Sequence, residues 1–158
     1  MSETLHIPQT KDRAEIYESL FPQMKALLAD ESDQIANMAN FAAVLKEAFN
    51  FFWVGFYLKK KGQLVLGPFQ GPIACTRIPF SKGVCGHSFS TNSTIVVPDV
   101  EAFPGHIACS SATKSEIVTP VRDSYGEIIG VLDIDSDVIN DFSNVDKVWI
   151  EKMAALIN

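Results

Sequence analysis

The sequence predicts an α+β fold in which helices pack on an antiparallel sheet. Helical patterns lie at the two ends of the chain, and strand patterns lie in the middle as pairs joined by short turns. Strands do not alternate with helices as they do around a parallel sheet. An antiparallel sheet covered by helices is therefore the natural architecture.

Length and composition indicate one globular domain. The chain has 158 residues, 47% hydrophobic and 20% charged, and we expect a single domain over residues 1–158 with a loose start over residues 1–10. A net charge of −6 argues against a nucleic-acid partner, which would need a basic patch. The first residues have no apolar core typical of a signal peptide, and no stretch approaches a membrane span, so we expect no membrane partner and a cytoplasmic location.

Three segments have the apolar spacing of helices. Residues 11–29 form the first pattern, and Pro22 predicts a kink or break within it. Residues 34–48 form the second and residues 144–157 the last, which residues 141–143 can cap.

The first strand pattern, residues 51–59, reads FFWVGFYLK and returns through a Lys-Lys-Gly turn into residues 63–67. Alternation places these residues on one face: Phe51, Trp53, Gly55 and Tyr57. Since Gly55 has no side chain, we expect open space between Trp53 and Tyr57. The two rings are either part of the core or the walls of a pocket for a small apolar or cationic group.

A second hairpin is predicted from residues 115–121 and 127–135. Asp133 and Asp135 share one face of its second strand, and Glu116 begins the first. These carboxylates are either strand-end charges facing water or an acidic cluster that binds an ammonium group. In a cluster, a neighbouring carboxylate could raise the pKa of one member enough to make it a proton donor.

All three cysteines lie in the most irregular stretch, between residues 67 and 116, where only a short helix over 83–90 and a short strand over 94–97 are expected. Cys75, Cys85 and Cys109 are either small buried hydrophobes, metal ligands or redox-active thiols. Redox chemistry needs a second thiol to resolve a sulfenic acid, and this stretch supplies one. Cys85 lies at a possible helix start, where a thiolate would be stabilised.

A metal site would draw on these thiols together with His87 and His106. Structural zinc sites pair their ligands at short spacing, whereas these cysteines lie ten and 24 residues apart. We therefore predict no metal and no cofactor.

At these residues the sequence resembles the free methionine-(R)-sulfoxide reductases, which are single GAF domains. The resemblance covers most of residues 50–136 and includes all three cysteine positions. It rests on these segments: FWVGFYL, LGPFQGPIACTRIPFSKGVCG, VPDVEAFPGHIAC, SEIVTPV and GEIIGVLDIDS.

The resemblance implies a six-stranded antiparallel sheet with helices on its faces, a homodimer, and free methionine (R)-sulfoxide as substrate. It implies that Cys109 attacks the sulfoxide sulfur while Glu116 or one of the two aspartates protonates the oxygen. Cys75 would resolve the sulfenic acid, unless Cys85 does, and thioredoxin would reduce the disulfide.

The substrate ammonium would lie at Glu116, Asp133 and Asp135, and its methyl group against Trp53. The alternative is a GAF module without catalysis that binds a small metabolite or senses redox state.

Overall fold

A computed structural model describes residues 4–157. Over these residues the chain forms four α-helices, one short 3₁₀ helix and six strands, in the order α1 (Arg13–Ala29), α2 (Gln34–Phe49), β1 (Trp53–Lys60), β2 (Gln63–Gln70), β3 (Arg77–Pro79), α3 (Gly83–Thr91), β4 (Ile95–Val97), η1 (Val100–Ala102), β5 (Ser115–Arg122), β6 (Ile128–Ser136) and α4 (Asn144–Ala154). The strands form one sheet in the order β3-β2-β1-β6-β5-β4, and all neighbouring strands are antiparallel. The predicted six-stranded antiparallel α+β fold is confirmed.

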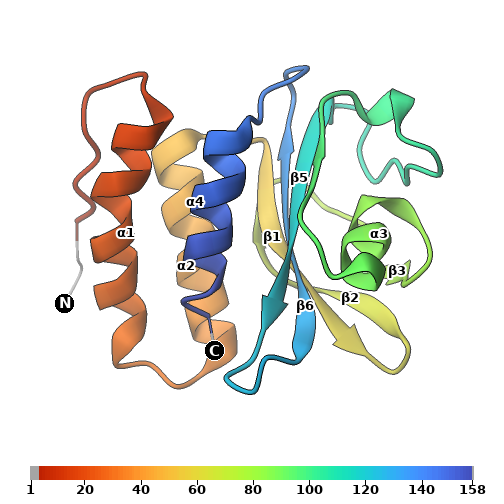
Figure 1. Cartoon of the computed structure of the whole chain (residues 1–158), viewed down its shortest axis with the longest axis horizontal. Coiled ribbons are helices and arrows are strands. Elements are labelled where there is room, and N and C mark those ends of the chain that lie inside the picture. Colours follow the sequence, from red (N-terminus) through yellow and green to blue (C-terminus); the bar gives the residue numbers. More distant parts are fainter. Residues whose placement is uncertain (1–3, 158) are drawn as a thin grey trace.

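The sheet separates two layers (Figure 1). Helices α1, α2 and α4 cover one face, and α3 with the irregular segments around it covers the other. Each layer has its own apolar cluster. Along β1, Val54 and Phe56 pack into the helical layer, whereas Trp53 and Tyr57 face α3. One strand therefore contributes to the main core on one face and to the second layer on the other.

The predicted helices are present with small changes at their ends. The break expected at Pro22 is wrong, because one helix spans Arg13–Ala29. Pro22 faces solvent, while Leu20 and Met24 on either side of it are fully buried. The apolar stripe is thus uninterrupted, and its packing keeps the helix continuous despite the lost backbone hydrogen bond.

Two details of the strands differ from expectation. The first strand begins at Trp53, so Phe51 and Phe52 lie before it and do not follow its alternation: Phe51 packs into the helical core and Phe52 beside α3. Strand β3 was not predicted. It is three residues long, too short to give a period in the sequence, and it pairs with the start of β2.

Residues 4–10 contain no helix or strand, but Leu5 and Ile7 pack against the helical core. The rest of the predicted loose start lies outside the described residues. Among the described residues, no helix is long and apolar enough to cross a membrane.

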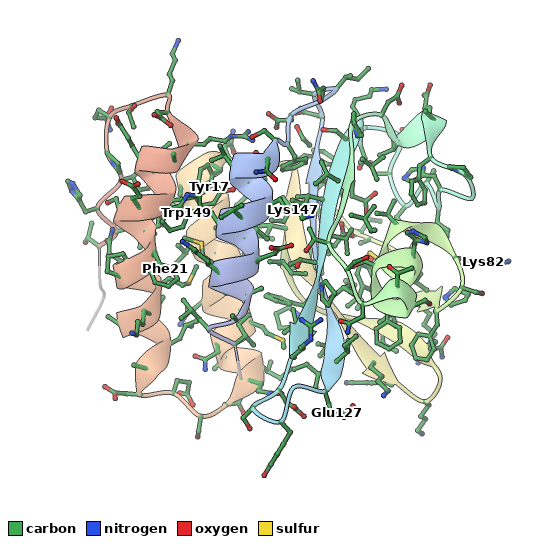
Figure 2. All side chains as sticks on the ribbon, viewed as in Figure 1. Tyr17, Phe21, Lys82, Glu127, Lys147 and Trp149 are labelled. Carbon is green, nitrogen blue, oxygen red and sulfur yellow. A yellow bond between two sulfur atoms is a disulfide. The ribbon has the colours of Figure 1, made fainter. Side chains whose placement is uncertain are left out.

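Helices α1 and α4 are joined by aromatic packing and by a buried polar contact. Tyr17, Phe21 and Trp149 lie between the two helices (Figure 2), with Tyr17 and Trp149 stacked at 6.1 Å between ring centroids. Asp146, whose side chain is almost fully buried, accepts hydrogen bonds from the Arg13 guanidinium at 3.1 and 3.2 Å and from the Tyr17 hydroxyl at 2.8 Å. The same carboxylate completes a capping box with Ser143 at the start of α4.

We expect Asp146→Ala to lower the free energy of unfolding by about 3 kcal/mol, because it leaves the buried Tyr17 hydroxyl without its acceptor and removes one of the two carboxylates that pair with the half-buried Arg13. Urea unfolding followed by circular dichroism measures this loss. Glu151→Ala, at an exposed position of the same helix, is the control and should change stability by less than about 0.5 kcal/mol. Equal effects of the two substitutions would contradict the role given to Asp146.

Candidate active site

A small cavity of about 40 Å³ lies between the sheet and α3. It is lined by β1, β5, β6, the start of α3 and the irregular segments on either side of them. Of the eight residues predicted for the site, Cys75 does not line the cavity. The other seven do: Trp53, Tyr57, Cys85, Cys109, Glu116, Asp133 and Asp135. The structure thus brings together side chains spread over more than eighty positions of the sequence.

Strand register brings the three carboxylates together. Glu116 on β5 lies directly opposite Asp135 on β6, and Asp133 is two residues earlier on the same face. On the other side of β6, Asp133 pairs with Gly55 and Asp135 with Trp53. Glu116 and Asp133 are 5% and 6% exposed. The interpretation as an acidic cluster therefore holds for this pair, and that of strand-end charges facing water does not.

Burial raises the pKa of all three carboxyl groups. For Glu116 the pKa lies well above its usual range because of burial and the nearby charges of Asp133 and Asp135. The pKa of Asp135 is also well raised, by burial and by Asp133. The pKa of Asp133 rises to about 6, because burial raises it while hydrogen bonds from Glu116 and Cys85 oppose the rise. Near neutral pH Asp133 is therefore the member that ionises most readily, while the raised pKa values of Glu116 and Asp135 favour their protonated forms.

One oxygen of this charged group lacks a partner. Among the described residues, Oδ1 of Asp133 is buried and accepts no hydrogen bond. An unsatisfied buried carboxylate oxygen is costly, and such an atom in a residue that lines a cavity suits a cationic or hydrogen-bonding group.

Two of the three thiols are joined. Cys75 and Cys109 form a disulfide across a sequence separation of 34, with a Cα–Cα distance of 5.4 Å. The carbonyl of Cys75 accepts a hydrogen bond of 3.0 Å from the Tyr57 hydroxyl. Cys109 lines the cavity and Cys75 does not, so only one of the two bonded sulfurs belongs to a residue of the cavity wall.

Cys85 is a free thiol in the first turn of α3 and is 3% exposed. Burial raises its pKa well above the usual range, and the charges of Asp133 and Glu116 raise it further. The expectation of a stabilised thiolate at this helix start is therefore wrong, because desolvation and two carboxyl groups outweigh the helix dipole. Near neutral pH Cys85 is protonated.

Aromatic rings form one wall of the cavity. The Trp53 ring stacks on Phe69 at 5.2 Å and on Tyr57 at 5.8 Å, and its Nε1 donates a hydrogen bond of 3.1 Å to the carbonyl of Pro72. The open space expected at Gly55 does not exist, because a Cβ there would lie 2.3 Å from the Cβ of Phe69 and 2.7 Å from the Trp53 ring. Gly55 instead allows the ring to lie flat across the strand.

The start of α3 forms another part of the lining. Gly83, at φ = 68°, and Val84 both face the cavity, and the cap residue Lys82 makes no side-chain hydrogen bond to the helix. Figure 2 shows the Lys82 side chain directed away from the fold. The first backbone N–H groups of α3 are therefore not capped by that side chain and can bind a carboxylate.

Three residues of the cavity wall were not predicted from the sequence as parts of this site: His106, Ile107 and Thr113. All three line the cavity, and Nε2 of His106 lies 3.8 Å from Oε2 of Glu116. Burial lowers the pKa of His106, so the imidazole is neutral at neutral pH and its contact with Glu116 is not a charged pair. In the sequence His106 is a candidate zinc ligand near Cys109, and Ile107 and Thr113 belong to no pattern that predicts a site.

A family model, curated relatives and solved structures all relate this chain to the same family. Residues 34–158 match the GAF domain family. The chain is 54% identical to GAF domain-containing protein A of Dictyostelium discoideum, over 100% of this chain and 99% of that protein. It is 41% identical to the free methionine-R-sulfoxide reductase of Saccharomyces cerevisiae, over 93% of this chain and 86% of that protein.

Among solved structures, the free methionine-R-sulfoxide reductase of Neisseria meningitidis, in complex with its substrate, superposes with a TM-score of 0.93 at 50% identity. The match covers 98% of this chain and 92% of that one. The chain therefore belongs to the GAF domain family and, within it, to the free methionine-R-sulfoxide reductases.

Proposed function

We propose that this protein is an enzyme that reduces free methionine (R)-sulfoxide to methionine, with its own thiols as the electron source. The observation that carries the proposal is that one cavity is lined both by a disulfide-bonded cysteine, Cys109, and by a buried acidic cluster. The similarity to reductases of this name, across nearly the whole chain, supports the same substrate.

The acidic cluster accounts for recognition of a free amino acid. Asp133 carries a negative charge and an unpartnered oxygen, and a substrate ammonium supplies both the opposite charge and the missing donor. Asp135 and Glu116 surround the same group. The substrate carboxylate binds the backbone N–H groups at the start of α3, and the methyl group packs on the Trp53 ring.

Cys109 is the nucleophile in this proposal. It faces the cavity, whereas Cys75 does not, and Cys85 is held as a protonated thiol. The Cys109 sulfur attacks the sulfoxide sulfur, and the S–O oxygen leaves the substrate and stays on Cys109. Methionine and a Cys109 sulfenic acid result, so the sulfoxide is reduced and the cysteine is oxidised by two electrons.

Glu116 is the acid in this proposal. Its raised pKa favours the protonated carboxyl group, and that proton can be transferred to the sulfoxide oxygen as the S–O bond weakens.

The Cys75 thiol then condenses with the sulfenic acid. The product is the Cys75–Cys109 disulfide, and water leaves. Thioredoxin reduces this disulfide by thiol exchange, which returns both thiols and completes the cycle.

The proposal includes a homodimer, a single domain over residues 1–158 and a cytoplasmic location. Aliphatic side chains exposed on α4 and the loop before it, Val138, Ile139, Val145 and Val148, support an association surface. A reductant-dependent enzyme fits a reducing compartment.

The overall proposal is tested by adding methionine sulfoxide to purified protein with thioredoxin, thioredoxin reductase and NADPH. NADPH should be consumed only when protein and the R epimer are both present. Absence of turnover with thioredoxin and with small thiols alike would leave the protein as a GAF module without catalysis.

We expect the enzyme to turn over free methionine (R)-sulfoxide and to ignore its N-acetyl derivative, because the acetyl cap removes the ammonium that pairs with Asp133. The kcat/KM for the capped substrate should fall by about 100-fold or more, as for a buried charge left unpaired. Asp133→Asn should lose most of this discrimination, whereas Asp137→Asn, an exposed aspartate beyond the same strand, should keep it. Similar kcat/KM values for both substrates would rule out the role given to the cluster.

We expect Cys109→Ser to form no methionine even in a single turnover without reductant, because it lacks the attacking sulfur. Cys75→Ser should release about one methionine per active site and then stop as a sulfenic acid. Methionine release with thiol counting measures both outcomes. A full burst from Cys109→Ser would move the nucleophile to another cysteine. Continued cycling of Cys75→Ser with thioredoxin would assign resolution to Cys85.

The charge on Asp133 should lower stability as pH rises. Its pKa is higher folded (about 6) than in an unfolded chain (about 4), so the native state binds more protons and loses stability as pH rises through this window. Asp133→Asn should therefore exceed the wild type in unfolding free energy by about 2 kcal/mol at pH 8, and the difference should shrink towards pH 4. Denaturant unfolding with the disulfide intact measures it. A difference that does not vary with pH, or the same change in Asp137→Asn, would contradict the assignment.

A further inference from the structure

We infer that the side chains of Cys85, Glu116 and Asp133 form a binding site for a thiophilic divalent cation such as Zn²⁺. One ligand atom from each residue, a sulfur and two carboxylate oxygens, lies within 4.8 Å of the others. All three residues are buried and come from three different elements, α3, β5 and β6. The sheet and the helix packed on it therefore hold the three atoms close together before any ion binds.

A second observation indicates that this position takes a cation. Asp133 lines the cavity, and its Oδ1 atom is buried and has no hydrogen-bond partner among the described residues. The adjoining cavity of about 40 Å³ exceeds the ~10–15 Å³ that one water molecule needs. An ion with a bound water can therefore reach the unpartnered oxygen.

The chemistry of the donors selects the metal. Thiolate and carboxylate ligands together suit Zn²⁺ and Co²⁺, whereas Mg²⁺ and Ca²⁺ prefer oxygen alone. With bonds of about 2.0–2.3 Å, tetrahedral ligands lie roughly 3.3–3.8 Å apart. The three atoms would need to close by no more than about 1.5 Å, which side-chain rotation can supply. Nε2 of His106 lies 3.8 Å from Oε2 of Glu116 but outside this group of three atoms, so the three residues alone form the proposed site.

Binding is an exchange of protons for metal without oxidation or reduction. The Cys85 thiol releases one proton as its sulfur bonds to the metal, and a protonated Glu116 releases another. The resulting thiolate and two carboxylates neutralise the ion. The spacing of the cysteines did not predict this metal site, because its ligands are one cysteine and two carboxylates on separate elements.

A cation here would occupy the place that the proposed function gives to the substrate ammonium. Zn²⁺ should then inhibit the enzyme by competing with methionine sulfoxide. This inhibition depends on the proposed function, whereas binding of the ion does not.

The disulfide form of the protein isolates the site for a direct test. With Cys75 and Cys109 joined, Cys85 is the one thiol left among the three cysteines of the chain. Any thiolate-to-metal charge-transfer band must therefore come from Cys85. We expect anaerobic titration of the oxidised protein with Co²⁺ to give this band together with the visible bands of tetrahedral Co²⁺, at one ion per chain, and Zn²⁺ to displace them.

Variants separate this site from surface binding. Cys85→Ser, or Cys85→Ala if the serine variant does not fold, should remove the charge-transfer band. Asp133→Asn should weaken Co²⁺ binding about tenfold or more, and Asp137→Asn should not. Thermal unfolding of each variant verifies the fold. No thiolate band at about millimolar Co²⁺, a band that persists without Cys85, or equal affinities for the two aspartate variants would each overturn the inference.

The two proposals fail in different ways. If the protein shows Co²⁺ bands but no turnover without metal, the metal site stands and the reductase function falls. If it turns over methionine sulfoxide but gives no Co²⁺ band, the reductase function stands and the metal site falls. If both are present, Zn²⁺ should raise the apparent KM for methionine sulfoxide and leave kcat unchanged, since ion and substrate would compete for the carboxylate of Asp133.

Discussion

The burial of acidic side chains on neighbouring strands is the constraint on which the rest of the structure depends. Glu116 lies on β5, and Asp133 and Asp135 lie on β6, two adjacent interior strands of the sheet. Glu116 pairs with Asp135, whereas Asp133 lies between Gly55 of β1 and Val118 of β5. Removing carboxyl groups from water is costly, so they remain protonated or need a cation. A ligand with an ammonium group, or a divalent ion, meets that need directly.

The strands that carry this unfavourable cluster are supported from the opposite face. Ile117 and Ile134, which alternate with Glu116 and Asp133, are buried in the helical core under α1, α2 and α4. At the end of β6, the Ser136 hydroxyl donates a hydrogen bond of 2.6 Å to the carboxylate of Asp141. The same carboxylate forms an ion pair with Arg13, so this end of the strand is held in place. Hydrophobic burial on one side thus offsets the electrostatic cost on the other.

Much of the fold and part of the site could be predicted from the sequence because they depend on local periodicity. The alternation in β1 places Trp53 and Tyr57 on one face, and the same alternation in β6 places Asp133 with Asp135. Features that depend on contacts between distant segments were missed. The three-residue strand β3 has no period of its own, and the raised pKa of Cys85 depends on carboxyl groups thirty and more residues further along the chain.

The packing around Gly55 also could not be predicted from one strand alone. A glycine between two aromatic residues predicts either a gap or close packing, and the sequence of one strand does not distinguish them. The neighbouring strand decides: Phe69 on β2 lies opposite Gly55 and fills the space. His106 and Thr113 lie in the irregular segment between β4 and β5, where no period exists, and only the folded chain shows that they line the cavity with Cys109.

The contrast between rigid and irregular elements fits the chemistry we propose. An acid and an ammonium site must stay in place through the reaction, and strands paired on both sides provide that fixity. A nucleophile that meets first a substrate and then a second thiol has to shift between the two. Cys109 lies between β4 and β5 in a segment that contains only a short 3₁₀ helix, and its backbone N–H bonds the nearby carbonyl of Ile107. A local turn of this kind can move without disturbing the sheet, so redox change at Cys109 and Cys75 need not alter the acidic cluster.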